Sequence, residues 1–292
     1  MDYLYDDNQA PIWDEIKKKR EGKGLEIEPN YDAIEPLGSC GGLRLHVLGS
    51  GSKGNSCVVE GTQGALLIDA GFSKKASLER LAALNIKPES IKAILLTHEH
   101  YDHTKNLGVI ARALKVPVYA TFGTASAPVV SKEVSPYLIH QRDSFDIAGI
   151  RVKTFPTSHD ANEPVAFRFE SDKDALAYLT DSGVLSAEAK ELLGDARILA
   201  LESNYDPKML EEGPYPLYLK KRIASDTGHL SNVQALDALK EIISSRLQTI
   251  VGMHLSETNN HPEVSITAIR TLIQDESIKV YAARQNRPIS YI

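Results

Sequence analysis

The residue types that could do chemistry gather in the segment Thr97-His98-Glu99-His100-Tyr101-Asp102-His103. Imidazoles and carboxylates are the side chains that bind divalent metal ions in proteins. The segment follows the apolar run 91–96, which predicts a buried strand ending in a tight loop. Such a loop can point His98 and His100 to one side and Asp102 and His103 to the other, and so serve two cations about 3.5–4 Å apart. A polar solvated loop would not need this cluster, so the sequence predicts a metal site.

Three further candidate ligands come directly after later apolar segments. His159 follows 150–157, Asp181 follows 175–180, and His254 follows 249–253. Taken singly, a polar residue at a strand end is more often a cap or a surface group. Together with the loop at 97–103, these residues would complete a metal site collected at the strand ends of two sheets.

From Leu43 onward the chain alternates short apolar segments with turns and helical stretches. Segments of strand length and composition lie at 43–48, 57–60, 65–69, 91–96, 150–155, 165–170, 175–180, 198–201, 249–253 and 278–282. Helices are predicted near 75–84, 105–114 and 122–131, and three more alternate with the last strands. Both halves run from strands to helices, so we expect an α/β protein in which two sheets pack together with helices outside.

Residues 1–41 differ from the rest, and we interpret them as an N-terminal extension of a domain at 42–292. The segment 11–20 predicts one short helix, because Pro11 lies at its start, acidic residues follow, and basic residues lie at its end. The remainder of the extension carries several prolines and glycines and is expected to be irregular.

The composition is that of a soluble globular protein, with 42% hydrophobic and 25% charged residues. No apolar run approaches a membrane span, and the N-terminus lacks a basic and apolar leader, so we expect a cytoplasmic protein with no membrane partner. The net charge of −6 argues mildly against nonspecific nucleic-acid binding. Two bound cations would restore a positive field at the site, so a nucleic-acid substrate is not excluded.

With its candidate ligands in this order, the chain resembles the metallo-β-lactamase superfamily, whose motifs run His-x-His-x-Asp-His and then a His, an Asp and a last His. The resemblance covers about residues 43–292 and implies a four-layer αββα sandwich. It also implies two divalent metal ions, zinc or manganese, with iron as a further option. One ion would be held by His98, His100 and His159 and the other by Asp102, His103 and His254, with Asp181 bridging them and Asp69 orienting ligands from behind the metal loop.

Other motifs make the resemblance specific to the YycJ (WalJ) family of bacterial metallo-hydrolases. These motifs are Gly49-Ser50-Gly51-Ser52-Lys53-Gly54-Asn55-Ser56, Leu201-Glu202-Ser203-Asn204, Gly213-Pro214-Tyr215-Pro216, Leu219-Lys220-Lys221-Arg222-Ile223 and Gly228-His229-Leu230-Ser231-Asn232. The intervals 159–181 and 181–254 are too short for the arm or inserted domain of related nucleases. The resemblance implies 5′-to-3′ exonuclease activity on DNA, in repair or processing. The N-terminal extension departs from the family's usual shorter form.

These residues favour phosphodiester hydrolysis. Two divalent cations, five neutral imidazoles, two carboxylates and a hydroxide would leave about one net positive charge, which suits a singly negative phosphodiester. Asp102 would bind metal and accept a proton, while His229, oriented by Glu202, would protonate the leaving oxygen. A purely structural Glu–His hydrogen bond is the alternative for that pair. The runner-up function is hydrolysis of a small ester, thioester or lactone, and a third is a metal-stabilised nucleic-acid-binding scaffold.

Two segments leave alternatives open. The run 49–54 satisfies the dinucleotide pattern G-x-G-x-x-G, but the strand-like residues at 57–60 follow it, so we expect no nucleotide cofactor. A glycine-rich hairpin and a phosphate-facing loop both remain as interpretations. In the second segment, basic and aromatic residues interleave and either line a nucleic-acid groove or form an ordinary solvated helix face; they are Tyr215, Tyr218, Lys220, Lys221 and Arg222.

Overall fold

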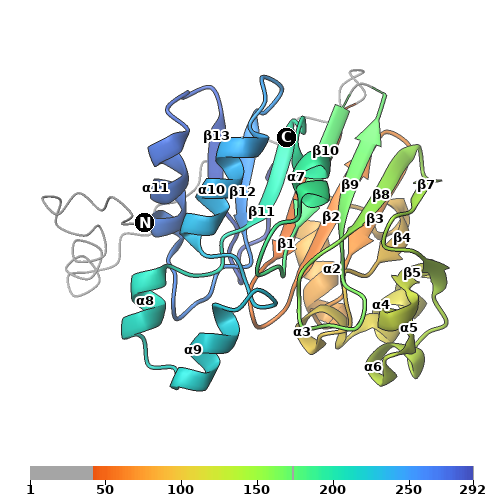
Figure 1. Ribbon diagram of the computed structural model, residues 1–292. Helices are drawn as coiled ribbons and strands as arrows, with labels where there is room; N and C mark the ends of the chain where they lie inside the picture. The colour runs from red at the N-terminus through yellow and green to blue at the C-terminus, as the bar shows by residue number, and fades with distance from the viewer. Residues whose placement is uncertain (1–41, 173, 292) are drawn as a thin grey trace, which may run out of the picture. The chain divides into compact units, whose positions relative to one another are not determined.

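The strands of the protein form two sheets of equal size that pack face to face (Figure 1). The computed structural model describes residues 42–172 and 174–291. The predicted helix at 11–20 and the boundary at 41 lie outside these residues or at their limit. The αββα sandwich predicted for the domain is confirmed.

The first sheet is built mainly from the N-terminal half of the domain. Its strands, in spatial order, are β14 (Ile289–Tyr291), β1 (Arg44–Gly49), β2 (Ser56–Gly61), β3 (Gly64–Ile68), β4 (Ile91–Leu95), β5 (Val118–Thr121) and β6 (Tyr137–Ile139). The strands from β14 to β3 pair antiparallel, and those from β3 to β6 pair parallel. Strand β14, near the C-terminus, is therefore the edge strand of this sheet and lies next to β1.

The second sheet repeats this arrangement with the C-terminal half. Its strands, in spatial order, are β13 (Lys279–Ala282), β12 (Thr249–Met253), β11 (Ile198–Glu202), β10 (Asp174–Leu179), β9 (Val165–Ser171), β8 (Ile150–Pro156) and β7 (Ser144–Ile147). Here β10 to β13 pair parallel, whereas β7 to β10 pair antiparallel. Parallel strands end at the same edge, which brings Asp181 and His254 to one end of the sandwich.

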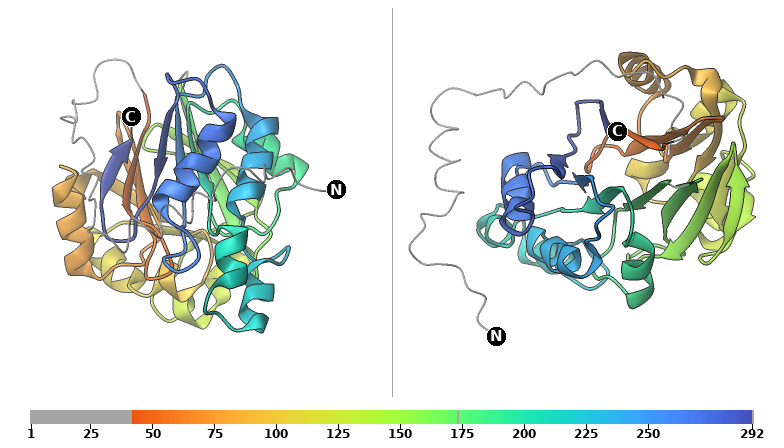
Figure 2. Two further views of the ribbon diagram at one scale, coloured as in Figure 1. Left: turned by 90° about the vertical axis from the view of Figure 1, so that its left-hand side faces the viewer. Right: turned by 90° about the horizontal axis from the view of Figure 1, so that it is seen from above.

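Helices cover both outer faces of the sandwich (Figure 2). On the first sheet these are α2 (Lys74–Ala83), α4 (Leu107–Leu114), α5 (Phe122–Ser126) and α6 (Pro128–Ser131), with the short η1 (Pro88–Ser90) before β4. On the second sheet they are α7 (Ala187–Leu193), α10 (Asn232–Ile242) and α11 (Pro262–Leu272). Three short helices lie at the lower end of Figure 1: α3 (Tyr101–Thr104), α8 (Pro207–Glu212) and α9 (Leu217–Ile223).

Alternating side chains of the strands fill three apolar layers. Leu45, Phe167 and Tyr178 belong to the layer between the two sheets. Leu239 and Ile250 belong to the layer beneath the helices of the second sheet, and a third layer lies beneath those of the first. Strands with helices on one side and a sheet on the other are buried on both faces, which explains their near-continuous apolar sequences.

The helix predicted at 122–131 is in fact two short helices. The chain is extended at Ala127, with φ of −63° and ψ of 135°, because Pro128 disfavours helical geometry in the residue before it. The strands β5, β6, β7 and β14 were not predicted, because each has only three or four residues and too little alternation to be recognised. Among the described residues, no helix has both the length and the apolarity to cross a membrane.

Candidate metal centre

The candidate ligands lie where the strands of both sheets end. Three buried residues at these ends, Asp69, Asp181 and His254, have left-handed backbones with φ of 58°, 59° and 54°. Such geometry is uncommon outside glycine, although Asp and His tolerate it better than most residues. The other described non-glycine residues with positive φ are not buried, whereas these three are buried together, and strained buried residues of this kind cluster at functional sites.

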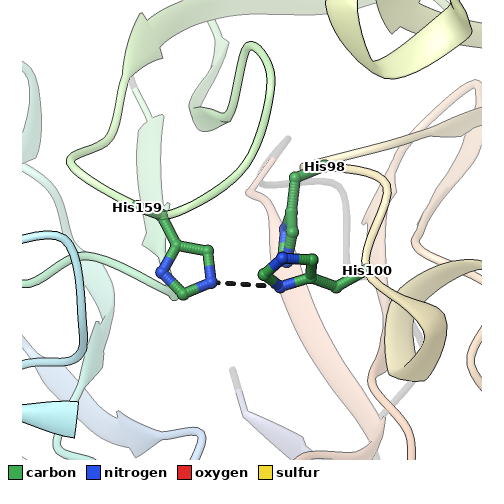
Figure 3. Close-up of side chains that lie close together, drawn as sticks. All are labelled: His98, His100 and His159. Atoms are coloured by element: carbon green, nitrogen blue, oxygen red, sulfur yellow. Dashed lines mark hydrogen bonds between the residues drawn. The ribbon is translucent and has the colours of Figure 1, made fainter. Parts of the chain in front are cut away.

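The first ligand group is a set of three imidazoles. His98 and His100 come from the loop after β4, and His159 comes from the loop between β8 and β9 (Figure 3). His159 Nε2 lies 3.2 Å from His100 Nδ1. His98 Nε2 is buried and has no hydrogen-bond partner among the described residues. Each of the three imidazoles offers one nitrogen to a common point.

The other nitrogen of each imidazole is held by a neighbouring group. His98 Nδ1 lies 3.0 Å from Thr97 Oγ1, His100 Nε2 lies 3.2 Å from the Asp160 carbonyl oxygen, and His159 Nδ1 lies 3.0 Å from the Gly228 carbonyl oxygen. A nitrogen that donates to a carbonyl carries the proton, so the opposite nitrogen keeps its lone pair. These contacts select the tautomers that metal ligation requires.

The second ligand group consists of Asp102, His103 and His254. His103 Nδ1 is bonded to Asp69 Oδ2 at 2.7 Å, which leaves His103 Nε2 3.5 Å from Asp102 Oδ2. His254 Nε2 lies 3.7 Å from the same carboxylate oxygen and, within the described chain, forms no hydrogen bond. Asp69 also accepts hydrogen bonds from Thr97 N and Oγ1, so it holds the start of the loop at 97–103 in place.

Asp181 lies between the two groups. Its Oδ2 is 3.4 Å from His103 Nε2 and its Oδ1 is 3.7 Å from His159 Nε2. The side chain is almost fully buried, and Oδ2 forms no hydrogen bond to any described residue. A buried ionised oxygen without a donor is costly, and a cation would satisfy it. The donor set therefore fits divalent metal ions.

The electrostatics of the centre point the same way. Burial alone would raise the pKa of Asp181, but His254 and His103 hold it well below its usual range. Burial would likewise lower the pKa of His103, yet Asp69 and Asp102 raise it to about 9. Burial holds the pKa of His98 well below its usual range, so that imidazole is neutral. The buried, ionised carboxylates of the centre are thus stabilised by nearby positive charge, which protons or metal ions can supply.

Glu202 and His229 form a hydrogen-bonded pair beside this centre, a contact that the family resemblance implied. His229 Nδ1 lies 2.8 Å from Glu202 Oε1. The carboxylate is fully buried and its Oε2 accepts hydrogen bonds from Ser182 N and Leu230 N, at 2.9 and 3.2 Å. Glu202 Oε1 also lies 3.2 Å from His254 Nδ1. This second contact was not predicted, and it makes Glu202 a support for a candidate metal ligand as well.

A cleft of about 300 Å³ opens over the centre. It is lined by candidate ligands and His229, and also by Tyr215, Leu219, Arg222 and Ile223 from α9 and the turn before it. The predicted basic and aromatic stretch is therefore divided. Tyr215 and Arg222 line the cleft, whereas Tyr218 and Lys221 are exposed elsewhere and Lys220 bonds the Glu211 carbonyl oxygen.

Sequence reasoning missed two residues that touch the candidate ligands. Asn55 Nδ2 lies 3.0 Å from both Asp102 Oδ2 and His103 Nε2, and the Asp160 carboxylate lies 3.5 Å from His159 Nε2. Asn55 belongs to the glycine-rich run at 49–56, which strand β2 follows, so the run lacks the helix that a dinucleotide fold requires. Its place in this run, which is one of the motifs that carry the family resemblance, was the available signal.

Comparison with known proteins agrees with this geometry. The profile of the family described as "Beta-lactamase superfamily domain" matches residues 65–254, and the chain belongs to this superfamily. It is 37% identical over 249 residues to Exodeoxyribonuclease YycJ of Bacillus anthracis, which covers 82% of this chain and 92% of that protein. It is also 37% identical over 240 residues to Exodeoxyribonuclease WalJ of Streptococcus pneumoniae, covering 80% and 89% of the two chains.

Solved structures show the same fold at lower identity. The metallo-β-lactamase fold protein YhfI of Bacillus subtilis is 17% identical with a TM-score of 0.65, over 86% of this chain and 99% of that one. The short form of human tRNase Z is also 17% identical, with a TM-score of 0.58 over 84% and 98%. These two likenesses establish the sandwich alone, since identity this low says nothing of the substrate.

Proposed function

We propose that the chain is a metal-dependent nuclease of the YycJ/WalJ type, which removes nucleotides from DNA in the 5′-to-3′ direction. The observation that carries this proposal is a cluster of buried side-chain atoms that form no hydrogen bond within the described residues, namely His98 Nε2, Asp181 Oδ2 and His254 Nε2. Asp181 and His254 also line the cleft. The two exodeoxyribonuclease relatives, which match most of the chain, support nucleic acid as the substrate and DNA in preference to RNA. A role in DNA repair or processing in the cytoplasm stays a prediction.

The proposed cofactors are two divalent metal ions. His98, His100 and His159 would hold one ion, Asp102, His103 and His254 would hold the other, and Asp181 would contact both. Nitrogen and oxygen donors without a cysteine suit zinc, manganese or iron. When bound, the ions polarise the phosphate oxygens and lower the pKa of water at the site.

The protein's own residues would handle the protons. The pKa of Asp102 lies below its usual value because His103 and His254 outweigh the effect of burial, so its carboxylate is ionised and can accept a proton from the attacking water. His229 lines the cleft while its Nδ1 faces Glu202, which leaves Nε2 to deliver a proton to the leaving oxygen. The proposed base thus comes from the segment after β4 and the proposed acid from the loop between α9 and α10.

The activity can be tested with purified protein loaded with zinc or manganese. Single-stranded DNA, duplex DNA and RNA, each carrying a 3′ label, are incubated beside a panel of thioesters and lactones. We expect nucleotides to be released from the 5′ end of DNA, more slowly from RNA, and no turnover of the panel. Turnover of a thioester or lactone with intact DNA would favour the small-molecule hydrolase instead.

A further inference from the structure

The cleft is lined by two chemically different sets of residues. The candidate ligands are polar and would receive the phosphate that is cleaved. The second set, which we call the α9 wall, contains Tyr215, Leu219 and Ile223, of which Leu219 and Ile223 are one helical turn apart and so share a face of α9. An aromatic ring beside aliphatic side chains is a surface on which a nucleobase can stack.

Arg222 is the single Lys or Arg among the described residues that line this cleft. Its Nε and Nη2 contact Asp160 Oδ2 at 2.7 and 2.6 Å. A guanidinium has five N–H donors. No described residue accepts a hydrogen bond from Arg222 Nη1, so its N–H groups can donate to an anion. Asp160 in turn places its Oδ1 3.5 Å from His159 Nε2. The Asp160 carboxylate therefore lies between the Arg222 guanidinium and His159 of the first ligand group.

The end of α9 is also hydrogen-bonded to the loop that carries His229. His229 N donates to the Ile223 carbonyl oxygen at 2.9 Å, and His159 Nδ1 donates to the Gly228 carbonyl oxygen at 3.0 Å. The end of α9 and the loop that follows it therefore hold His229 and His159 at fixed distances from Arg222. A substrate bound against α9 would therefore lie at a fixed position relative to His229, the proposed acid, and to the first ligand group.

We propose that the α9 wall is a subsite for one terminal nucleotide, in which Arg222 binds the terminal 5′-phosphate and Tyr215, with Leu219 and Ile223, holds the base. The inference rests on the proposed nuclease function and adds what the enzyme recognises. A cleft of about 300 Å³ lies at the small end of ligand sites and suits one nucleotide better than a duplex. The free end of the strand would enter the cleft, and the rest would leave across the metals.

The same segment supplies matched controls. Lys221 and Tyr218 are exposed, neighbour the proposed residues in sequence, and do not line the cleft. The side chain of Arg222 is 61% exposed, so its loss should leave the fold intact, because exposed ion pairs contribute little to stability. Arg222→Met and Lys221→Met therefore remove the same charge from two faces of one helix.

The test compares 3′-labelled single-stranded DNA carrying a 5′-phosphate or a 5′-hydroxyl. We expect the wild type to prefer the phosphorylated end by roughly 10- to 100-fold in kcat/KM, the effect of one charge-assisted contact. Arg222→Met should lose this preference and Arg222→Lys should keep part of it, with metal content unchanged in both. Tyr215→Ala should raise KM on both DNAs. Lys221→Met and Tyr218→Ala should match the wild type.

The outcomes separate the two proposals. Hydrolysis of bis-nitrophenyl phosphate, which has neither a base nor a second phosphate, reports on the metal centre by itself and should be unchanged in Lys221→Met. If Arg222→Met keeps the preference for the phosphorylated end, or if Lys221→Met loses it equally, the subsite is wrong while the nuclease function stands. If the wild type cleaves DNA without distinguishing the two ends, the subsite is again overturned. A wild type that cleaves no DNA would overturn the proposed function itself.

Discussion

Glu202 contacts both the proposed general acid and a candidate metal ligand. Its Oε1 faces His229 Nδ1 at 2.8 Å and His254 Nδ1 at 3.2 Å, and two backbone amides hold its Oε2. A buried carboxylate with this many partners has a single orientation. Burial opposes its ionisation, but His229 and His254 keep its pKa below the usual value.

His229 should act on protons without binding metal. His229→Ala should retain both metals and DNA affinity, yet slow DNA hydrolysis by roughly 10²–10⁴-fold, the usual contribution of a general acid. A nitrophenyl phosphodiester should lose far less, because its leaving group departs without protonation. Single-turnover rates on both substrates check this, and equal losses would show that the role is structural.

Glu202→Gln should affect two properties at once. The amide should loosen His229 and also His254, so metal affinity should fall about 10- to 100-fold, as for other groups that orient ligands. DNA hydrolysis at saturating metal should fall less than in His229→Ala, because the imidazole is still present. Metal titration by calorimetry, with the exposed Glu191→Gln as control, measures the first effect. Unchanged metal affinity would mean that the contact between Glu202 and His254 does not help to position His254.

At the scale of elements, the loop after β3 determines how closely the metal loop can approach. A Cβ added at Gly71 would lie 1.9 Å from the Asp102 carbonyl oxygen and 2.5 Å from Asn55 N. Both contacts are with backbone, which cannot turn away. Only glycine allows the glycine-rich run, the loop after β3 and the metal loop to pack together in this way.

Gly71→Ala should therefore disturb the candidate metal centre, although Gly71 is not itself a candidate ligand. We expect the free energy of unfolding to fall by about 1–3 kcal/mol, typical of overpacking, and metal affinity to fall with it. Gly194→Ala is the control, because its added Cβ would meet no atom closer than 3.3 Å. Urea unfolding and elemental analysis of both variants test this, and a Gly71→Ala protein with normal stability and metal content would contradict it.

The sequence was most informative where a pattern is local. The metal loop at 97–103 could be predicted because its ligands follow one another directly, and most strands were predicted because their alternation is confined to a few residues. The contact between Asn55 and Asp102 spans 47 residues, and that between Arg222 and Asp160 spans 62. No periodicity records such pairings. The family resemblance implied the ligand set and the Glu202–His229 pair, but only the packed fold shows the contacts of Asn55 and Arg222.

At the scale of the whole molecule, the proposed metals would join the two sheets. The loop after β4 supplies His98, His100, Asp102 and His103 from the first sheet, whereas His159, Asp181 and His254 follow strands of the second. Metal binding to the folded protein alone adds stability in proportion to the logarithm of metal concentration over Kd. The centre should therefore act as a clamp between the halves of the sandwich.

Removing the metals should lower the thermal stability of the domain. Saturating chelator should reduce Tm by about 5–15 °C, given roughly 4 kcal/mol from tight binding and a shift of a few degrees per kcal/mol. Asp181→Ala should respond much less to chelator, because it lacks the carboxylate that contacts both groups. Scanning calorimetry with and without chelator checks both, and an Asp181→Ala protein with the full chelator response would argue against a bridging role.

The most direct test of the central claim is a titration of DNA hydrolysis with metal. Chelator-treated protein is mixed with increasing zinc or manganese, and nucleotide release from 3′-labelled DNA is followed at each ratio. We expect no activity without metal, and a rise that levels off at two equivalents per chain. Hydrolysis that persists after complete chelation, or that reaches its maximum at one equivalent, would contradict a two-metal nuclease built from these residues.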